Sequence, residues 1–135
     1  MPLNRSITCF LIDDDKDDQE IFMLALQDIN VAVACITANN GNDALQKFND
    51  DETFLPDYIF LDLNMPKING RQCLIEIKKI NRLKHIPVII YSTSSAQRDK
   101  VETEILGASA FITKPSSISE FSKILSHVFL KNHQQ

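Results

Sequence analysis

Acidic side chains directly follow two short apolar runs of the sequence. The run "ITCFLI" (7–12) is followed by five aspartates within six positions, and "YIFL" (58–61) is followed by Asp62. Continuously apolar runs are typical of strands covered on both faces of a parallel sheet, and the carboxyl ends of parallel strands meet at one edge. We therefore expect Asp13, Asp14 and Asp62 to converge at that edge.

Such a cluster of carboxylates requires a positive charge. Two carboxylates about 4 Å apart repel by about 1 kcal/mol in water-like surroundings and by about 4 kcal/mol at a protein-like effective dielectric. Oxygen ligands without a nearby His or Cys favour Mg²⁺, Ca²⁺ or Mn²⁺ over Zn²⁺. A calcium loop beginning at Asp13 fails, because Asp18 stands where Gly is required and Leu24 where Glu is required. Mg²⁺ needs only a few protein oxygens and fits best, with Mn²⁺ as the alternative.

The other aspartates of the first group need no metal. Asp15, Asp17 and Asp18 stand where a helix is expected to begin. Carboxylates at that place accept hydrogen bonds from free N–H groups and complement the positive end of the helix dipole. We assign these three residues to the start of the helix.

Two more polar side chains follow later apolar runs. Ser92 ends "VIIYS", and Lys114 follows "AFIT". Taken alone, a Ser in this place is usually a turn residue and a Lys is usually solvated. Together with a metal at the same rim, however, a hydroxyl and an ammonium describe a site for a phosphoryl group.

Segments with helical periodicity alternate with the apolar runs. The five runs span residues 7–12, 31–37, 58–61, 87–91 and 110–113. The apolar positions of the expected first helix are Ile21, Leu24 and Ala25 with Phe22, Leu26 and Ile29, and those of the fourth are Val101, Ile105 and Ala108. Five βα units with right-handed crossovers predict an α/β three-layer sandwich around a doubly wound, five-stranded parallel sheet, in the flavodoxin-like strand order 2-1-3-4-5.

Composition limits the classes of protein to be considered. The chain has 135 residues with 44% hydrophobic content, and we expect one domain over residues 1–135 with its core at about 6–130. A net charge of −4 without a Lys/Arg stripe argues against direct binding to nucleic acid. No segment approaches the ~20 apolar residues of a membrane span, so we expect a cytoplasmic protein without membrane insertion. The three cysteines lack metal or redox spacing, and we expect reduced core thiols.

The ordered motifs resemble those of a known family. "FLIDDD", "FLDLNMPKINGR", "PVIIYSTS" and "GASAFITKP" are similar to the receiver domain of two-component response regulators, over about residues 6–130. The resemblance implies that Asp62 accepts a phosphoryl group from a sensor histidine kinase or a phosphotransfer protein. It also implies that Asp14, Asp62 and the backbone carbonyl of Asn64 bind Mg²⁺ directly, with Asp13 acting mainly through water.

The same resemblance implies roles for residues at the last two strands. Ser92 and Thr93 would contact the phosphoryl group, and Lys114 would neutralise its charge. Phe111 would be the switch aromatic, and the bond between Lys114 and Pro115 would be cis. A cis bond before Pro costs only about 0.5 to 1 kcal/mol.

Two other interpretations stay open. A phosphatase of the haloacid dehalogenase type also has a nucleophilic Asp after a strand, but it needs a second Asp where this chain has Asn64, which cannot transfer a proton. The other is a receiver-like binding module that is never phosphorylated. A phosphatase would release phosphate in steady turnover, and a receiver would be labelled once by a phosphodonor. The binding module would not be labelled.

We expect output through a surface rather than through a second domain. Only "KNHQQ" follows the apolar stripe of the last helix, so we expect no output domain. By the resemblance, a downstream protein would bind the face made by the fourth helix, fifth strand and fifth helix when Asp62 is phosphorylated. A homodimer could use the same surface.

Overall fold

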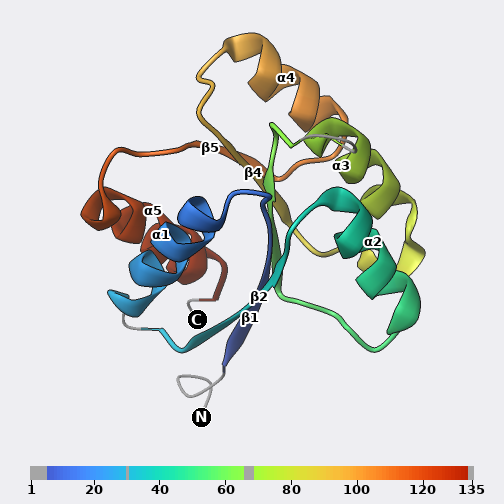
Figure 1. Cartoon of the computed structure of the whole chain (residues 1–135), viewed down its shortest axis with the longest axis horizontal. Coiled ribbons are helices and arrows are strands. Elements are labelled where there is room, and N and C mark those ends of the chain that lie inside the picture. Colours follow the sequence, from blue (N-terminus) through green and yellow to red (C-terminus); the bar gives the residue numbers. More distant parts are fainter. Residues whose placement is uncertain (1–5, 30, 66–68, 134–135) are drawn as a thin grey trace.

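The computed structural model describes residues 6–29, 31–65 and 69–133, along which strands and helices alternate (Figure 1). The strands are β1 (Ile7–Ile12), β2 (Val33–Ala38), β3 (Tyr58–Asp62), β4 (Val88–Ser92) and β5 (Ala110–Thr113). The helices are α1 (Lys16–Gln27), α2 (Gly41–Asp50), α3 (Gly70–Lys79), α4 (Gln97–Ile105) and α5 (Ile118–His133), with a short 3-10 helix, η2 (Asn81–Leu83), before β4. None of these helices is long and apolar enough to cross a membrane.

The strands form one parallel sheet in the order β2-β1-β3-β4-β5. This order confirms the predicted doubly wound α/β topology. The order reverses between β1 and β3, so the carboxyl ends of these two strands flank the topological switch point, where open α/β sheets bind their ligands. In register, Asp62 of β3 lies beside Tyr91 of β4, and Ser92 lies beside Thr113 of β5.

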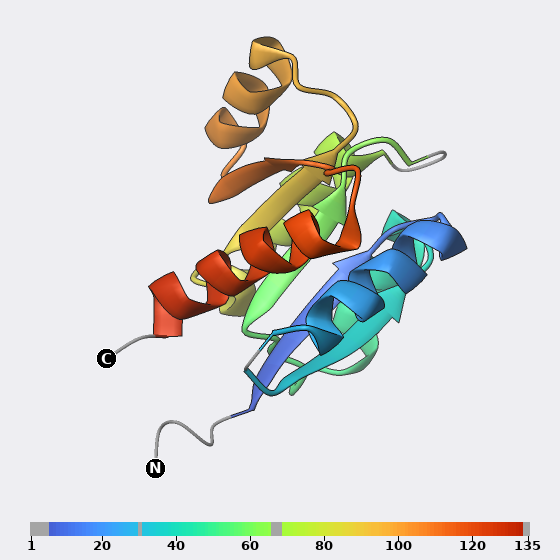
Figure 2. The same cartoon turned by 90° about the vertical axis from the view of Figure 1, so that its left-hand side faces the viewer.

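Helices cover both faces of the sheet and make two hydrophobic cores. Helices α1 and α5 lie side by side on one face, and α2 and α3 lie on the other (Figures 1 and 2). The first core contains Phe22, Tyr91 and Phe121, and the second contains Phe48 and Ile90. Cys9 and Cys73 are buried and Cys35 is half-buried, all three as free thiols. This arrangement is the predicted three-layer sandwich.

Helix α4 differs from the prediction. The helix ends at Ile105, so Ala108 lies outside it, and the side chains of Val101 and Ile105 are 43% and 78% exposed. Among the residues of α4, only Thr103 is buried. The helix lies beside the short edge strand β5, which offers little surface to cover, and polar contacts from Arg71 of α3 hold it in place.

Side-chain caps explain where several helices begin. Asp15 accepts hydrogen bonds from the N–H groups of Asp17 and Asp18 at the start of α1. Asn69 does the same for Gln72 at α3, and Ser117 accepts from the N–H of Glu120 at α5. Such caps typically contribute about 1 kcal/mol each. The assignment of Asp15 to a helix start is therefore confirmed.

Close packing at Gly70 joins α3 to the end of β3. The Gly70 N–H donates to the carbonyl of Leu63 at 3.1 Å. A Cβ at position 70 would lie 2.5 Å from both the Asp62 carbonyl oxygen and the Leu63 Cα, closer than real Cβ contacts allow. Because the obstacles are backbone atoms, they cannot rotate away. The absence of a side chain lets the helix begin next to Asp62.

We therefore expect Gly70→Ala to destabilise the protein by about 1 to 3 kcal/mol, the usual cost of overpacking. Urea unfolding monitored by circular dichroism measures the difference. Gln72→Ala, an exposed substitution on the same helix, is the control and should stay within about 0.5 kcal/mol of the wild type. Equal midpoints for Gly70→Ala and the wild type would show that the junction relaxes at no cost.

Candidate functional site

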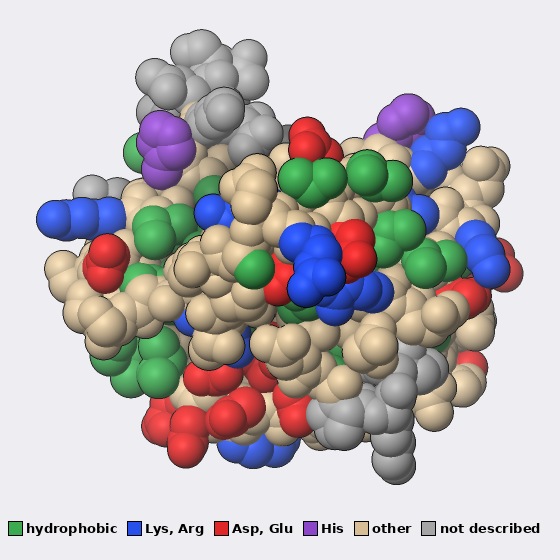
Figure 3. Space-filling model, turned by 90° about the horizontal axis from the view of Figure 1, so that it is seen from above, with side chains coloured by type: hydrophobic (Ala, Val, Ile, Leu, Met, Phe, Trp, Pro, Cys, Tyr) green, Lys and Arg blue, Asp and Glu red, His purple; other side chains and the backbone are tan. Residues whose placement is uncertain are grey.

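Three carboxylates meet at the carboxyl ends of β1 and β3. One oxygen from each of Asp13, Asp14 and Asp62 lies within 4.8 Å of the other two. Asp13 is fully buried and Asp62 is 4% exposed, whereas Asp14 is exposed. β1 runs upward in Figure 1, and Figure 3 shows the molecule from above. Acidic side chains gather near one edge of that upper surface. The structure thus brings together the residues that the sequence placed there.

Asp13 is held by protein hydrogen-bond donors on both of its oxygens. The N–H of Asp15 donates to Oδ1 at 2.9 Å, and the buried hydroxyl of Tyr91 donates to Oδ2. Burial raises the pKa of Asp13 to about 6, although the hydrogen bonds from Tyr91 and Asp15 oppose the rise. This carboxylate is therefore fixed by its neighbours, and one of its oxygens faces Lys114 at 3.8 Å.

Lys114 extends from the end of β5 into the acidic cluster. Its Nζ lies 3.6 Å from Asp62 and 3.8 Å from Asp13, but its shortest contact, 2.7 Å, is with Asp18 in the first turn of α1. Burial alone would lower the pKa of the ammonium, but the hydrogen bond to Asp18 and the neighbouring carboxylates raise it above its ordinary value. Lys114 is therefore charged. Asp18 forms an ion pair with it, in addition to its place in the first turn of α1.

Ser92 lies at the end of β4 with its hydroxyl in a hydrogen-bond network. Its buried Oγ accepts from the N–H of Ser94 at 3.1 Å and from the side-chain amide of Asn64 at 3.3 Å. The N–H of Asn64 in turn donates to Asp62 Oδ1 at 3.2 Å. Asn64 therefore connects the carboxylate to the hydroxyl. Thr93 is exposed at the same rim.

Phe111 lies on β5, outside the acidic cluster. Its partly buried ring packs against the core on the α2 and α3 side and lines a hollow of about 170 Å³ between α4 and β5. The ammonium of Lys100 lies 6.0 Å from the ring centroid. The ring thus borders α4, while the neighbouring strand β4 carries Ser92.

One prediction about the backbone is wrong. The described peptide bonds are all trans, including the bond between Lys114 and Pro115. The trans isomer is intrinsically favoured by about 0.5 to 1 kcal/mol. With it, the Lys114 N–H donates to the Ser92 carbonyl at 2.7 Å, and the side chain still reaches the acidic cluster. Nothing in this geometry requires the cis isomer.

The described residues fit a hard divalent cation. The potential ligands that converge here among the described residues are three carboxylates, with no thiolate or imidazole in the cluster. This donor chemistry matches Mg²⁺ or Mn²⁺. Asp14 is the most accessible of the three, and the backbone of Asn64 follows closely after Asp62.

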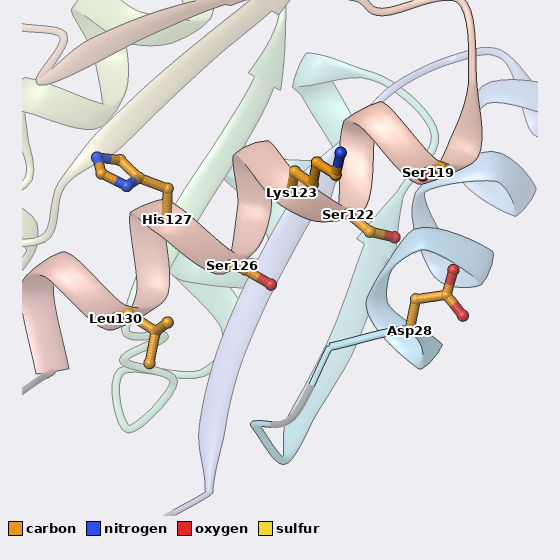
Figure 4. A pocket seen from close by; sticks show the side chains of 7 residues that line it. All are labelled: Asp28, Ser119, Ser122, Lys123, Ser126, His127 and Leu130. Atoms are coloured by element: carbon orange, nitrogen blue, oxygen red, sulfur yellow. The ribbon is translucent and has the colours of Figure 1, made fainter.

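A second hollow, of about 470 Å³, lies between α1 and α5 (Figure 4). Its lining includes Asp28, Lys123, His127 and Leu130, none of which belongs to the acidic cluster. The charged groups of Asp28, Lys123 and His127 point in different directions in Figure 4. Ligand sites bring a few polar groups together around a concave surface. We therefore place the chemistry of this chain at the acidic edge of the sheet.

The fold and this edge define an α/β protein whose acidic cluster lies at the topological switch point of the sheet. The chain belongs to the family of response regulator receiver domains, because the model of that family matches residues 9–126. It is therefore a receiver domain of two-component signalling.

Known members of the family are similar over most of their length. PilG of Pseudomonas aeruginosa is 35% identical over 119 residues, which cover 87% of this chain and 84% of that protein. The crystal structure of the phosphorylated cyanobacterial phytochrome response regulator RcpA superposes with a TM-score of 0.83 at 32% identity, covering 93% of each chain. The Mn²⁺-bound form of response regulator Rcp1 gives a TM-score of 0.81 at 26% identity, covering 96% of each chain.

Proposed function

We propose that this receiver domain accepts a phosphoryl group on Asp62 from a histidine kinase or a phosphotransfer protein, with Mg²⁺ as cofactor. The observation that carries the proposal is the position of Asp62. It ends β3 beside two other carboxylates and 3.6 Å from the ammonium of Lys114. The likeness to RcpA, whose structure is of the phosphorylated protein, and to Rcp1, whose structure holds Mn²⁺, supports both parts of the proposal.

In the proposed reaction an oxygen of Asp62 attacks the phosphorus atom. The new O–P bond forms as the P–N bond to the donor histidine breaks, and the imidazole nitrogen leaves with the electron pair. A bound Mg²⁺ would neutralise charge on the phosphoryl oxygens and hold them near the carboxylates. Lys114 stabilises the same oxygens, for which its ammonium has to leave Asp18. The hydroxyl of Ser92 turns to donate to the phosphoryl group.

The experiment that tests this proposal is incubation of the protein with acetyl phosphate, with and without Mg²⁺. Intact mass should show one added phosphoryl group per chain, and the added mass should be absent in EDTA. No labelling under either condition would favour a receiver-like binding module. Steady release of phosphate from many phosphomonoesters would favour a phosphatase, which Asn64 at the general-acid position argues against.

For the cofactor we propose Asp14 as a direct ligand and Asp15 as a helix cap. Asp14 offers an oxygen to the cluster, whereas Asp15 accepts hydrogen bonds from α1. Asp14→Asn should therefore lose at least as much affinity for Mg²⁺ as the loss of an outer-shell contact costs, which is about 10- to 100-fold. Asp15→Asn, which keeps a capping oxygen, should bind as the wild type. Calorimetric titration compares them, and equal losses would mean that the ligand is wrongly assigned.

For the output we propose a phosphorylation-gated interaction through α4, β5 and α5, with a protein partner or a second copy of the chain. The exposed apolar side chains of Val101 and Ile105 on α4 support this surface.

A further inference from the structure

Tyr91 lies in the core, yet its hydroxyl reaches the acidic cluster. The residue is 1% exposed, and its ring packs against Phe22 and Phe121 with ring centroids 6.2 and 6.4 Å away. It lies beside Asp62 in the sheet, so the two side chains leave the same face. From β4 its hydroxyl passes β3 and donates to Asp13 at the end of β1. Tyr91 thus connects two strands that are not neighbours.

The ring of Tyr91 contacts the other charged partner of the site. The Nζ of Lys114 lies 4.6 Å from the ring centroid, within the range of a cation–π interaction. One rigid side chain therefore contacts the carboxylate that faces the proposed metal and the ammonium that faces the phosphoryl group. Its rotation is restricted by the two phenylalanines, so both contacts are held in one geometry.

A hydroxyl in this place needs a reason. Burying a hydroxyl costs free energy unless it forms a hydrogen bond, and a Phe would fill the same core volume without that cost. The bond to Asp13 offsets the cost and leaves this carboxylate with a donor on each oxygen. Asp13 therefore has its orientation set before any cation arrives.

We propose that Tyr91 is a positioning residue of the metal and phosphoryl site: its hydroxyl fixes Asp13 for metal binding, and its ring places Lys114. The inference rests on the magnesium dependence proposed above. It assigns the two tasks to two parts of one side chain, which substitution can separate. Tyr91→Phe removes the hydroxyl and keeps the ring, whereas Tyr91→Leu removes both.

The first test measures Mn²⁺ binding to the full chain by electron paramagnetic resonance. Loss of an outer-shell hydrogen bond typically costs 10- to 100-fold in metal affinity, and we expect that loss for Tyr91→Phe. Tyr58→Phe is the control, because Tyr58 is 1% exposed in the same core and is the only other tyrosine in the sequence. It should bind Mn²⁺ as the wild type. Thermal melts establish that the variants are folded.

A second measurement needs no change at position 91. In the Tyr58→Phe protein, Tyr91 is the only tyrosine, and the chain has no Trp, so the near-ultraviolet absorption at wavelengths longer than those of phenylalanine comes from Tyr91 alone. Adding Mg²⁺ should shift that absorption, because the hydroxyl donates to a carboxylate of the metal site. An unchanged spectrum at saturating Mg²⁺ would overturn the coupling of Tyr91 to the metal.

The third arm separates the ring from the hydroxyl. At saturating Mg²⁺, Tyr91→Phe should be labelled by acetyl phosphate at close to the wild-type rate, and Tyr91→Leu more slowly, because only the latter releases Lys114. Equal Mn²⁺ affinity in the wild type and Tyr91→Phe would overturn the inference alone. A wild type that binds no Mn²⁺ would overturn the proposed cofactor and this inference together.

Discussion

Asp62→Asn should take up no phosphoryl group from acetyl phosphate, while Asp17→Asn is labelled at the wild-type rate. The side-chain amide of Asn is not a nucleophile at neutral pH, and no other carboxylate takes over the position at the end of β3. Asp13 has a hydrogen-bond donor on each oxygen, and Asp14 is exposed next to it. Asp17 is an exposed residue of the first turn of α1, so its loss changes the charge near the site without changing the cluster.

The measurement is intact mass after incubation with acetyl phosphate and Mg²⁺. Because one chain should gain one phosphoryl group, the wild type gives a single shifted species and Asp62→Asn gives none. Circular dichroism should show that both variants are folded. A shifted species of Asp62→Asn, formed at the wild-type rate, would place the phosphoacceptor elsewhere, and fragmentation of that species would locate it.

Much of the fold could be predicted because parallel sheets leave a simple pattern in the sequence. β1 and β5 have the predicted bounds, and the other strands begin or end within two residues of them. Surface helices leave a weaker pattern. Ile21, Phe22, Leu24 and Ala25 all fit the helical pattern, but α1 buries only Phe22 and Ala25 of these four, and Ile21 and Leu24 are 39% and 41% exposed. Periodicity identifies a helix more reliably than it identifies the buried face.

The strand-end residues of the site could be predicted for a similar reason. A parallel sheet brings the ends of its strands to one edge whatever its sequence, so Asp13 and Asp62, on neighbouring strands, had to meet, with Lys114 at the same edge. Contacts made by long side chains across the sheet follow no such rule. The bonds of Tyr91 to Asp13 and of Lys114 to Asp18 depend on reach and rotamer, which residue spacing does not encode. A Tyr directly before the Ser of "VIIYS" was the only available signal.

Polar contacts also connect the site to α4. Ser94, whose N–H donates to Ser92, donates through its own hydroxyl to Asp99 in the first turn of α4 at 2.6 Å. Asp99 is held in turn by Arg71 of α3 at 2.5 Å. If the hydroxyl of Ser92 turns to a phosphoryl group on Asp62, we expect its bond from the N–H of Ser94 to be disturbed, and with it the contact of Ser94 with Asp99 that helps to hold α4. Local bonds of this kind can bias a two-state packing element.

Phe111 borders the hollow between β5 and α4, so its ring is placed to respond to that shift. We expect Phe111→Ala to be phosphorylated on Asp62 like the wild type but to lose most of the phosphate-dependent change in partner affinity. Coupling between two sites is typically about 1 to 3 kcal/mol, or about 5- to 150-fold in affinity. Without the ring, α4 loses its aromatic neighbour on β5, and the ratio of partner affinities with and without the phosphoryl group should fall toward one.

The experiment compares the wild type with Phe111→Ala, each with and without beryllium fluoride as a phosphoryl mimic. Binding to a partner is measured, or self-association together with amide hydrogen exchange of residues 93–113 where no partner is known. Phe54→Ala is a matched control, because Phe54 is also a partly buried ring on the same core and has Lys47 over it at 4.8 Å. It should keep the wild-type response. If the mimic changes binding or self-association equally in all three proteins, Phe111 is only a core residue. The signal then reaches α4 through Ser94 and Asp99 without it.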